Sequence, residues 1–443
     1  MEVRVPMRSV PRWVAMLPIW VAMAWLLGTI LVFAAGPYDY QLNNPIQLYV
    51  YLGAVHLALY VGYILGSRIR IRYRPPTGHG PAIARVALGL GLLASAVGLV
   101  YTGGGDLGRL GLALRQPELA YYAGRTKEGI TAFNYVEMLT APFGALAITL
   151  GIFHWSALTR GYRLAVCSLA AITLVSAVGA AVRGPLVQFG VLSAAALAAA
   201  VLSGELKLGR RGRLLLVSSA LASVMAFAEY TAFITENRAP NVDMLYNPIT
   251  GERPKPDHYG YAIVPEEWHL AYTSAAFYVS HGYARLARAL EMPFLGSGLG
   301  MGNSPFLIRN AVRVIGWSEL EERSYGLRLD KEFFTGEFGI LWSTIYTWMA
   351  SDVTFPGTVL VVFVIGVGLG LSWVEALLLR APLAVVAFCC LAFIVFSFPM
   401  NNPLQDGPGI TVFLGLPIAW LVARRPHTRG LEVGARDPTV ISV

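Results

Sequence analysis

Arginine and histidine side chains stand at helical spacing in the second half of the chain. His281, Arg285 and Arg288 recur at i, i+4 and i+7 within a stretch from His269 to Glu291 whose pattern is helical. Their side chains therefore share one face, and Tyr278 lies beside them. Arginine presents a planar fork of donors that grips phosphate through two hydrogen bonds and stays charged near lipid. This face is typical of a site for a diphosphate at a membrane surface.

A second, shorter helix is predicted over residues 305–315. Ser304 is its expected N-cap and Gly316 stands just past its end. Arg309 and Arg313, at i and i+4, share one side of this helix, and its other side is apolar. The four arginines fit two alternatives equally well, a bound diphosphate or contacts with lipid head groups and nearby acidic residues. Those acidic residues are Glu319, Glu321 and Glu322.

A glycine-rich segment, GSGLGMG at 296–302, joins the two predicted helices. Its alternate glycines, Gly298, Gly300 and Gly302, can direct backbone N–H groups at an anion. A flexible turn explains the same glycines without any ligand. A dinucleotide-binding fold is excluded because no strand precedes the segment.

Two further charged residues stand at expected membrane boundaries. Asp352 precedes Pro356 at the start of a late apolar run. It fits a helix-start carboxylate, and it also fits a general base for a sugar hydroxyl. Arg183 occupies a very short turn between two apolar runs, where it is either a ligand for a substrate or an anchor that reaches the lipid head groups.

The composition explains why these residues would lie at a membrane. Of the 443 residues, 56% are hydrophobic and only 14% are charged, against roughly 25% charged in an average soluble domain. This excludes an ordinary soluble enzyme and a disordered chain. The formal charge of +8 indicates basic loops beside anionic lipid, and nucleic acid is the weaker interpretation. The three cysteines fall inside apolar runs and are expected to be packing residues.

We expect an all-α polytopic membrane protein with about ten transmembrane helices, since ten apolar runs are long enough to cross a bilayer. Basic clusters follow the second, fourth, sixth and tenth runs and place those ends, and both termini, in the cytoplasm. The ten runs are 13–35, 46–66, 82–101, 132–154, 164–182, 185–203, 214–235, 354–379, 382–400 and 409–423.

This pattern divides the chain into four parts. An N-terminal bundle of seven helices occupies 1–235, and a large extracytoplasmic loop occupies 236–353. The remaining transmembrane helices lie in 354–423, and 424–443 form a cytoplasmic tail. The loop is too long to be a connector and is therefore the expected functional part.

The layout resembles the bacterial O-antigen polymerases, the Wzy-like polymerases of oligosaccharide repeat units, and more distantly the O-antigen ligases. Three motifs carry the resemblance over residues 180–425. The pair Arg183–Gly184 opens a helix, a Tyr-x-x-x-Gly helix at Tyr278–Gly282 leads into GLGMG, and Asp352 with Gly357 begins a glycine-rich span. Ligases of this superfamily typically carry a histidine shortly before that span, and residues 335–353 contain none, which favours a polymerase.

The resemblance implies a glycosyltransferase of the bacterial inner membrane that polymerises undecaprenyl-diphosphate-linked repeat units into a surface polysaccharide. The growing glycan would move from its lipid diphosphate onto a hydroxyl of the incoming unit. Arg183 matches the family arginine and, with the four helical arginines, is assigned to the diphosphate. Asp352 is the first choice for the general base and His281 the second. Tyr278 and the three glycines are assigned to the acceptor glycan.

The expected partners follow from this activity. They are the lipid-linked oligosaccharides and membrane lipids, with a chain-length regulator and a flippase, and no nucleic acid. No carboxylate or histidine cluster has metal-ligand spacing, so neither a metal nor another cofactor is expected. A transporter or flippase of lipid-linked glycan, a ligase-like transferase and a noncatalytic scaffold are the alternatives.

Overall fold

The computed structural model describes residues 10–69, 71–72, 79–102, 107–117, 119–120, 132–238, 252–333, 342–424 and 440–441. Most of this part of the chain is helical, and each of the ten apolar runs forms helix. These helices are α1 (Arg12–Ala35), α2 (Pro45–Ser67), α3 (Gly80–Thr102), α6 (Ala132–Phe153), α7 (Arg160–Gly179), α8 (Gly184–Leu202), α9 (Arg210–Arg238), α15 (Ile345–Leu378), α16 (Pro382–Ser397) and the continuous series α17 (Gly407–Gly409), η4 (Ile410–Gly415) and α18 (Leu416–Ala423).

The chain is a helical membrane protein. Within the described residues, seven helices are long and apolar enough to cross a membrane: α1, α2, α6, α7, α8, α9 and α15. The other three runs offer shorter apolar stretches, at Gly80–Ala96, Pro382–Ser397 and Gly407–Ala423. The expected total of ten crossings therefore remains a prediction. Most of the expected tail, 425–439 and 442–443, lies outside the described residues, as do 239–251 of the expected loop.

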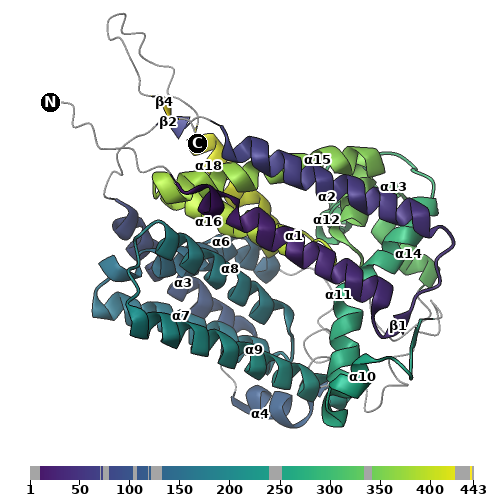
Figure 1. Ribbon diagram of the computed structural model, residues 1–443, viewed down its shortest axis with the longest axis horizontal. Helices are drawn as coiled ribbons and strands as arrows, with labels where there is room; N and C mark the ends of the chain where they lie inside the picture. Colours follow the sequence, from purple (N-terminus) through teal and green to yellow (C-terminus); the bar gives the residue numbers. More distant parts are fainter. Residues whose placement is uncertain are drawn as a thin grey trace, which may run out of the picture.

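The helices between α9 and α15 gather at one end of the bundle. They are α10 (Gly260–Ile263), η3 (Glu266–Trp268), α11 (His269–Glu291), α12 (Pro305–Ile315), α13 (Glu319–Arg323) and α14 (Tyr325–Phe333). In Figure 1 α11 runs across the direction of the long helices, with α12 to α14 beside it. We call this end of the bundle the loop side. The remaining elements are α4 (Leu107–Arg115), η1 (Trp155–Ala157) and two strand pairs, β1 (Tyr38–Asp39) with β3 (Arg253–Pro254) and β2 (Ile71–Arg72) with β4 (Val440–Ile441).

The core is built around α2 and α15, which pack closely along their length. A Cβ at Gly62 would collide with the carbonyl of Phe363, and one at Gly366 would collide with the carbonyl of Leu59. Small residues at such contacts let two helix backbones approach within a membrane. This contact fixes α15, whose first turns carry Asp352, against the rest of the bundle.

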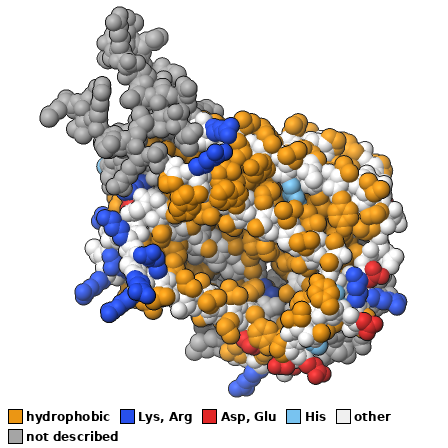
Figure 2. Space-filling view, in the orientation of Figure 1, with side chains coloured by type: hydrophobic (Ala, Val, Ile, Leu, Met, Phe, Trp, Pro, Cys, Tyr) orange, Lys and Arg blue, Asp and Glu red, His pale blue; other side chains and the backbone are white. Residues whose placement is uncertain are grey.

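Charge is distributed unevenly between the two ends of the molecule. In Figure 2 basic side chains lie at both ends of the molecule, whereas the acidic side chains lie mainly toward the loop side. Apolar side chains cover the surface between them. Such an apolar belt between polar ends is what a bilayer requires of the surface of a spanning bundle.

Candidate functional site

The glycine-rich segment and Asp352 meet at the loop side. One carboxylate oxygen of Asp352 accepts hydrogen bonds from the backbone N–H of Gly300 (2.9 Å) and Gly302 (3.0 Å), and the other accepts one from Asn303 (2.9 Å). The backbone carbonyl of Asp352 accepts a further hydrogen bond from the hydroxyl of Ser297 (2.8 Å). The anion held by these glycines is therefore a side chain of the protein itself. Both oxygens of Asp352 are engaged, which is a structural use of the carboxylate.

Close packing explains two of the glycines in this segment. A Cβ at Gly298 would lie 2.7 Å from a carboxylate oxygen of Asp352, and one at Gly302 would lie 2.9 Å from the same oxygen. Gly300 has a φ of +85°, in the left-handed region that favours glycine. The alternate spacing therefore serves a tight clasp around Asp352, which we call the Asp352 clasp: residues 297–303 with Asp352.

Replacing Gly302 by alanine is expected to destabilise the protein by about 1–3 kcal/mol, because the new methyl group must push the clasp off the carboxylate. Gly28→Ala is the matched control, since a Cβ at Gly28 meets nothing within 4 Å. Thermal unfolding of the purified protein in detergent measures both variants. Equal stability of Gly302→Ala and wild type would show that the clasp is loose.

The backbone of α15 breaks just after the clasp. Thr354 has φ 65° and ψ 169°, so α15 consists of two helical segments that meet at this residue. For a β-branched residue this conformation costs about 1–3 kcal/mol and persists only where surrounding contacts impose it. The expected apolar run begins at residue 354, which is where the second segment starts. The first segment, which begins at Ile345, lies within the part of the chain that the sequence assigns to the extracytoplasmic loop.

The predicted short helix is confirmed as α12. The Ser304 hydroxyl accepts from the backbone N–H of Leu307, and Gly316 ends the helix in the left-handed conformation. The apolar side of α12 packs against other loop-side elements, with Ile308 and Ala311 buried beside Leu320. Arg309 and Arg313 are exposed, as expected for the opposite side.

Two contacts orient α12 across the ends of two apolar helices. The side chain of Asn310 accepts a hydrogen bond from the hydroxyl of Tyr135 (2.5 Å), which stands near the loop-side end of α6. The backbone N–H of Phe306 donates to the carbonyl of Gln405 (3.2 Å), just before α17. At 100° per residue, Asn310 and the two arginines occupy the same half of α12. The basic side of α12 is therefore directed toward the level at which α6 begins.

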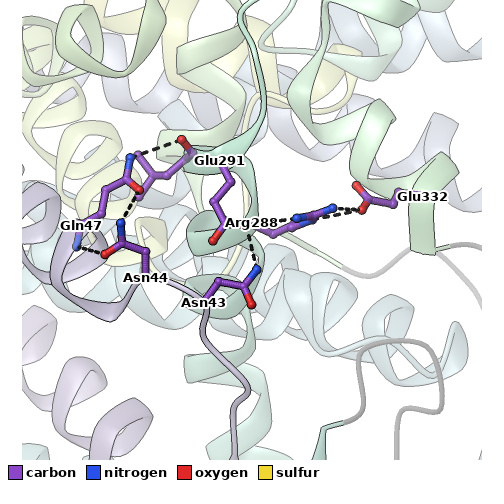
Figure 3. A network of polar contacts seen from close by, with 7 residues as sticks. Asn43, Asn44, Gln47, Arg288, Glu291 and Glu332 are labelled. Atoms are coloured by element: carbon purple, nitrogen blue, oxygen red, sulfur yellow. Dashed lines mark hydrogen bonds and ion pairs between the residues drawn. The ribbon is translucent and has the colours of Figure 1, made fainter.

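The arginines of α11 have carboxylate partners. Arg285 is 3% exposed and lies 2.5 Å from a carboxylate oxygen of Asp330 on α14. Burial lowers the pKa of Arg285 and raises the pKa of Asp330, and the attraction between the two groups opposes both changes. Arg288 pairs with Glu332 (2.5 Å) and with Glu291 (3.0 Å), as Figure 3 shows.

These ion pairs join three parts of the chain. Glu291 also accepts a hydrogen bond from the side chain of Asn43 (3.0 Å), in the segment before α2 (Figure 3). The acidic partners expected from the sequence are engaged elsewhere: Glu319 pairs with Arg323 and Glu321 with Lys331. Arg285 and Arg288 thus fasten α14 and the start of α2 to α11.

Arg183 lies at the loop side but apart from Arg285. Its guanidinium donates to the hydroxyl of Thr235 (2.6 Å) and to the carbonyl of Thr231 (3.3 Å), both on α9. Thr235 in turn contacts Ser274 on α11. Ser274 and Arg285 stand roughly 16 Å apart along α11, at 1.5 Å per residue. The structure therefore does not bring all the expected diphosphate ligands into one cluster.

The Tyr278–Gly282 motif serves close packing. A Cβ at Gly282 would collide with the carbonyl of Pro399, so this glycine lets α11 cross the end of α16. The carbonyl of Tyr278 accepts a hydrogen bond from the indole N–H of Trp342 (3.2 Å). His281, one turn later, is fully buried beside Glu252, a residue that the sequence patterns did not single out.

Among the described residues, no group of three or more His, Cys, Asp or Glu side chains is placed to hold a metal ion. Comparison of the chain with protein-family models, with curated proteins and with solved structures finds no match. The resemblance to the O-antigen polymerases therefore rests on the three motifs of the sequence.

Proposed function

We propose that the protein is a Wzy-like polymerase that transfers a growing glycan from a polyprenyl diphosphate onto a lipid-linked repeat unit. The protein lies in the bacterial inner membrane, with the loop side extracytoplasmic and both termini cytoplasmic. The basic clusters that follow the second, fourth, sixth and tenth apolar runs support this orientation, because short cytoplasmic loops carry the excess of Lys and Arg.

The observation that carries the proposal is the placement of α12. Its two exposed arginines share the half of α12 that carries Asn310, whose side chain contacts the loop-side end of α6. The diphosphate of a polyprenyl carrier sits at this level, because its lipid chain is in the bilayer and its sugar in water. Arg309 and Arg313 then stabilise the charge that develops on the leaving diphosphate. Arg183 binds the carrier of the second substrate at the α8 and α9 ends.

The experiment is polymerisation by purified protein in vesicles supplied with lipid-diphosphate repeat units. A ladder of products is expected, and it is expected to be unchanged by a chelator. Products that carry a single added unit would favour a ligase-like transferase and contradict polymerisation. Movement of labelled lipid across the vesicle membrane without any extension would favour a flippase.

The double variant Arg309→Gln, Arg313→Gln is expected to lower kcat/KM by about tenfold to a hundredfold, since it removes charge-assisted hydrogen bonds to the diphosphate. Lys331→Gln is the control: it removes an exposed cation of α14 that pairs with Glu321. If the control and the double variant polymerise equally well, the α12 arginines do not hold the leaving group.

A further inference from the structure

A histidine and a glutamate form an isolated buried pair beneath the β1–β3 strand pair. Nδ1 of His281 lies 2.9 Å from a carboxylate oxygen of Glu252, and the two residues are 0% and 2% exposed. Glu252 directly precedes β3, whose pairing with Tyr38 and Asp39 holds it in place. We propose that Glu252 positions the imidazole of His281, and that Nε2 of His281 accepts the proton of the acceptor hydroxyl. This inference rests on the proposed function.

The Glu252 carboxylate has further polar neighbours besides His281. A buried carboxylate is costly unless such neighbours compensate it. Arg285, one turn after His281 on α11, is close enough to Glu252 to attract it. Tyr38 lies on the other side and stays neutral, because burial, together with the charge of Glu252, raises the pKa of its hydroxyl. In the proposed arrangement the carboxylate of Glu252 faces the N–H of Nδ1, which leaves the lone pair of the ring on Nε2.

This tautomer is the one that a general base requires. In carboxylate–histidine pairs the carboxylate fixes the ring orientation and makes the opposite nitrogen the proton acceptor. Within the described part of the chain, Nε2 of His281 has no hydrogen-bond partner, and Nδ1 contacts Glu252 at an ion-pair distance without the geometry of a hydrogen bond. The two carboxylate oxygens of Asp352, by contrast, accept three backbone hydrogen bonds. Of the two candidate bases, His281 is therefore the one with an unused acceptor.

Aromatic rings surround the imidazole. The ring of Phe277 stacks on it at 4.5 Å between centroids, and the ring of Trp342 stands edge-on at 6.0 Å. Because His281 is fully buried, an acceptor hydroxyl reaches Nε2 after the half-buried Trp342 side chain moves. A hydrogen bond from the indole N–H to the carbonyl of Tyr278 holds Trp342 beside the imidazole. Apolar rings also exclude water from the proton transfer.

The transfer forms one bond and breaks one bond. The acceptor oxygen forms a bond to the anomeric carbon of the growing glycan and gives its proton to Nε2. The bond from that carbon to the diphosphate oxygen breaks, and its electron pair stays on the diphosphate, which gains one negative charge. The imidazolium formed at His281 is stabilised by Glu252 and later releases its proton to water. No other reactant is needed.

The test compares Glu252→Gln and Glu252→Asp with wild type in the polymerisation assay. We expect Glu252→Gln to lower kcat by about a hundredfold or more, with little change in KM, and Glu252→Asp to retain an intermediate kcat. Tyr40→Phe is the matched control, because it removes the hydrogen bond of Tyr40 to Ser280 (2.6 Å) on the neighbouring position of α11. This control is expected to keep the wild-type kcat.

A double variant separates positioning from folding. If Glu252 acts through His281, then Glu252→Gln combined with His281→Gln is no slower than His281→Gln alone. Multiplied losses, or a Glu252→Gln variant with the wild-type kcat, would overturn the assignment while polymerisation by wild type still stands. Absence of any polymer from wild type would instead overturn the proposed function, and the role of this pair with it.

Histidine ¹⁵N spectra give a readout that needs no activity. In labelled protein in vesicles, we expect one imidazole to carry its proton on Nδ1, and we expect Glu252→Gln to change that signal. The same signal should be absent from His281→Gln. A signal that shows the proton of His281 on Nε2 in wild type would contradict the proposed tautomer.

Discussion

Arg285→Leu is expected to lower the free energy of unfolding by about 3–5 kcal/mol, because it leaves Asp330 largely buried without its cation. The loss comes from the unpaired carboxylate more than from the missing attraction. The double variant Arg285→Leu, Asp330→Leu is therefore expected to recover most of the stability, since two apolar groups need no partner in this position. Equilibrium unfolding in detergent, followed by tryptophan fluorescence, measures all three variants.

Arg288→Leu is the control for this comparison. Arg288 also pairs with carboxylates, but it is 41% exposed, so water replaces part of what the ion pairs supply. Arg288→Leu is expected to lower the free energy of unfolding by less than about 1 kcal/mol. If Arg285→Leu and Arg288→Leu lower the free energy of unfolding equally, the Arg285–Asp330 pair is hydrated. In that case Arg285 could again be considered a ligand for the diphosphate.

Asp352→Ala is expected to destabilise the protein by about 3 kcal/mol or more, because three backbone donors of the Asp352 clasp lose their acceptor. Asp352→Asn keeps one acceptor oxygen, so its destabilisation is expected to be about half that of Asp352→Ala. The same two variants decide what the carboxylate does in the reaction. If Asp352 holds the clasp, Asp352→Asn keeps more than about a tenth of the wild-type kcat, since an amide still accepts hydrogen bonds.

A general base gives the opposite result. An amide does not accept a proton, so Asp352→Asn would then lose about a hundredfold or more in kcat while its thermal stability stays near that of wild type. Asn402→Ala serves as a control for damage to the clasp. It removes the contact between Asn402 and Asn303 without touching the carboxylate. Wild-type stability of Asp352→Ala would contradict the clasp itself.

Local features were predictable from the sequence. The ten apolar runs all form helix, α11 spans His269–Glu291 as expected, and the N-cap and left-handed end of α12 stand at Ser304 and Gly316. Each of these depends on residues within a few positions of one another. Helical periodicity, a capping hydroxyl and a glycine without a Cβ act over a turn or two, so their effects are visible in a single sequence.

The partners of the charged residues were decided only by the tertiary structure. Arg285 meets a carboxylate 45 positions away, Asp352 meets the backbone of a loop 49 to 52 positions away, and His281 meets Glu252, on a segment that shows no helical periodicity. Spacing along a helix indicates which side chains share a face. It does not indicate which carboxylate the folded chain brings to that face. Burial makes the partner of each charged residue important for stability. A charge removed from water must be compensated by the partner that packing supplies.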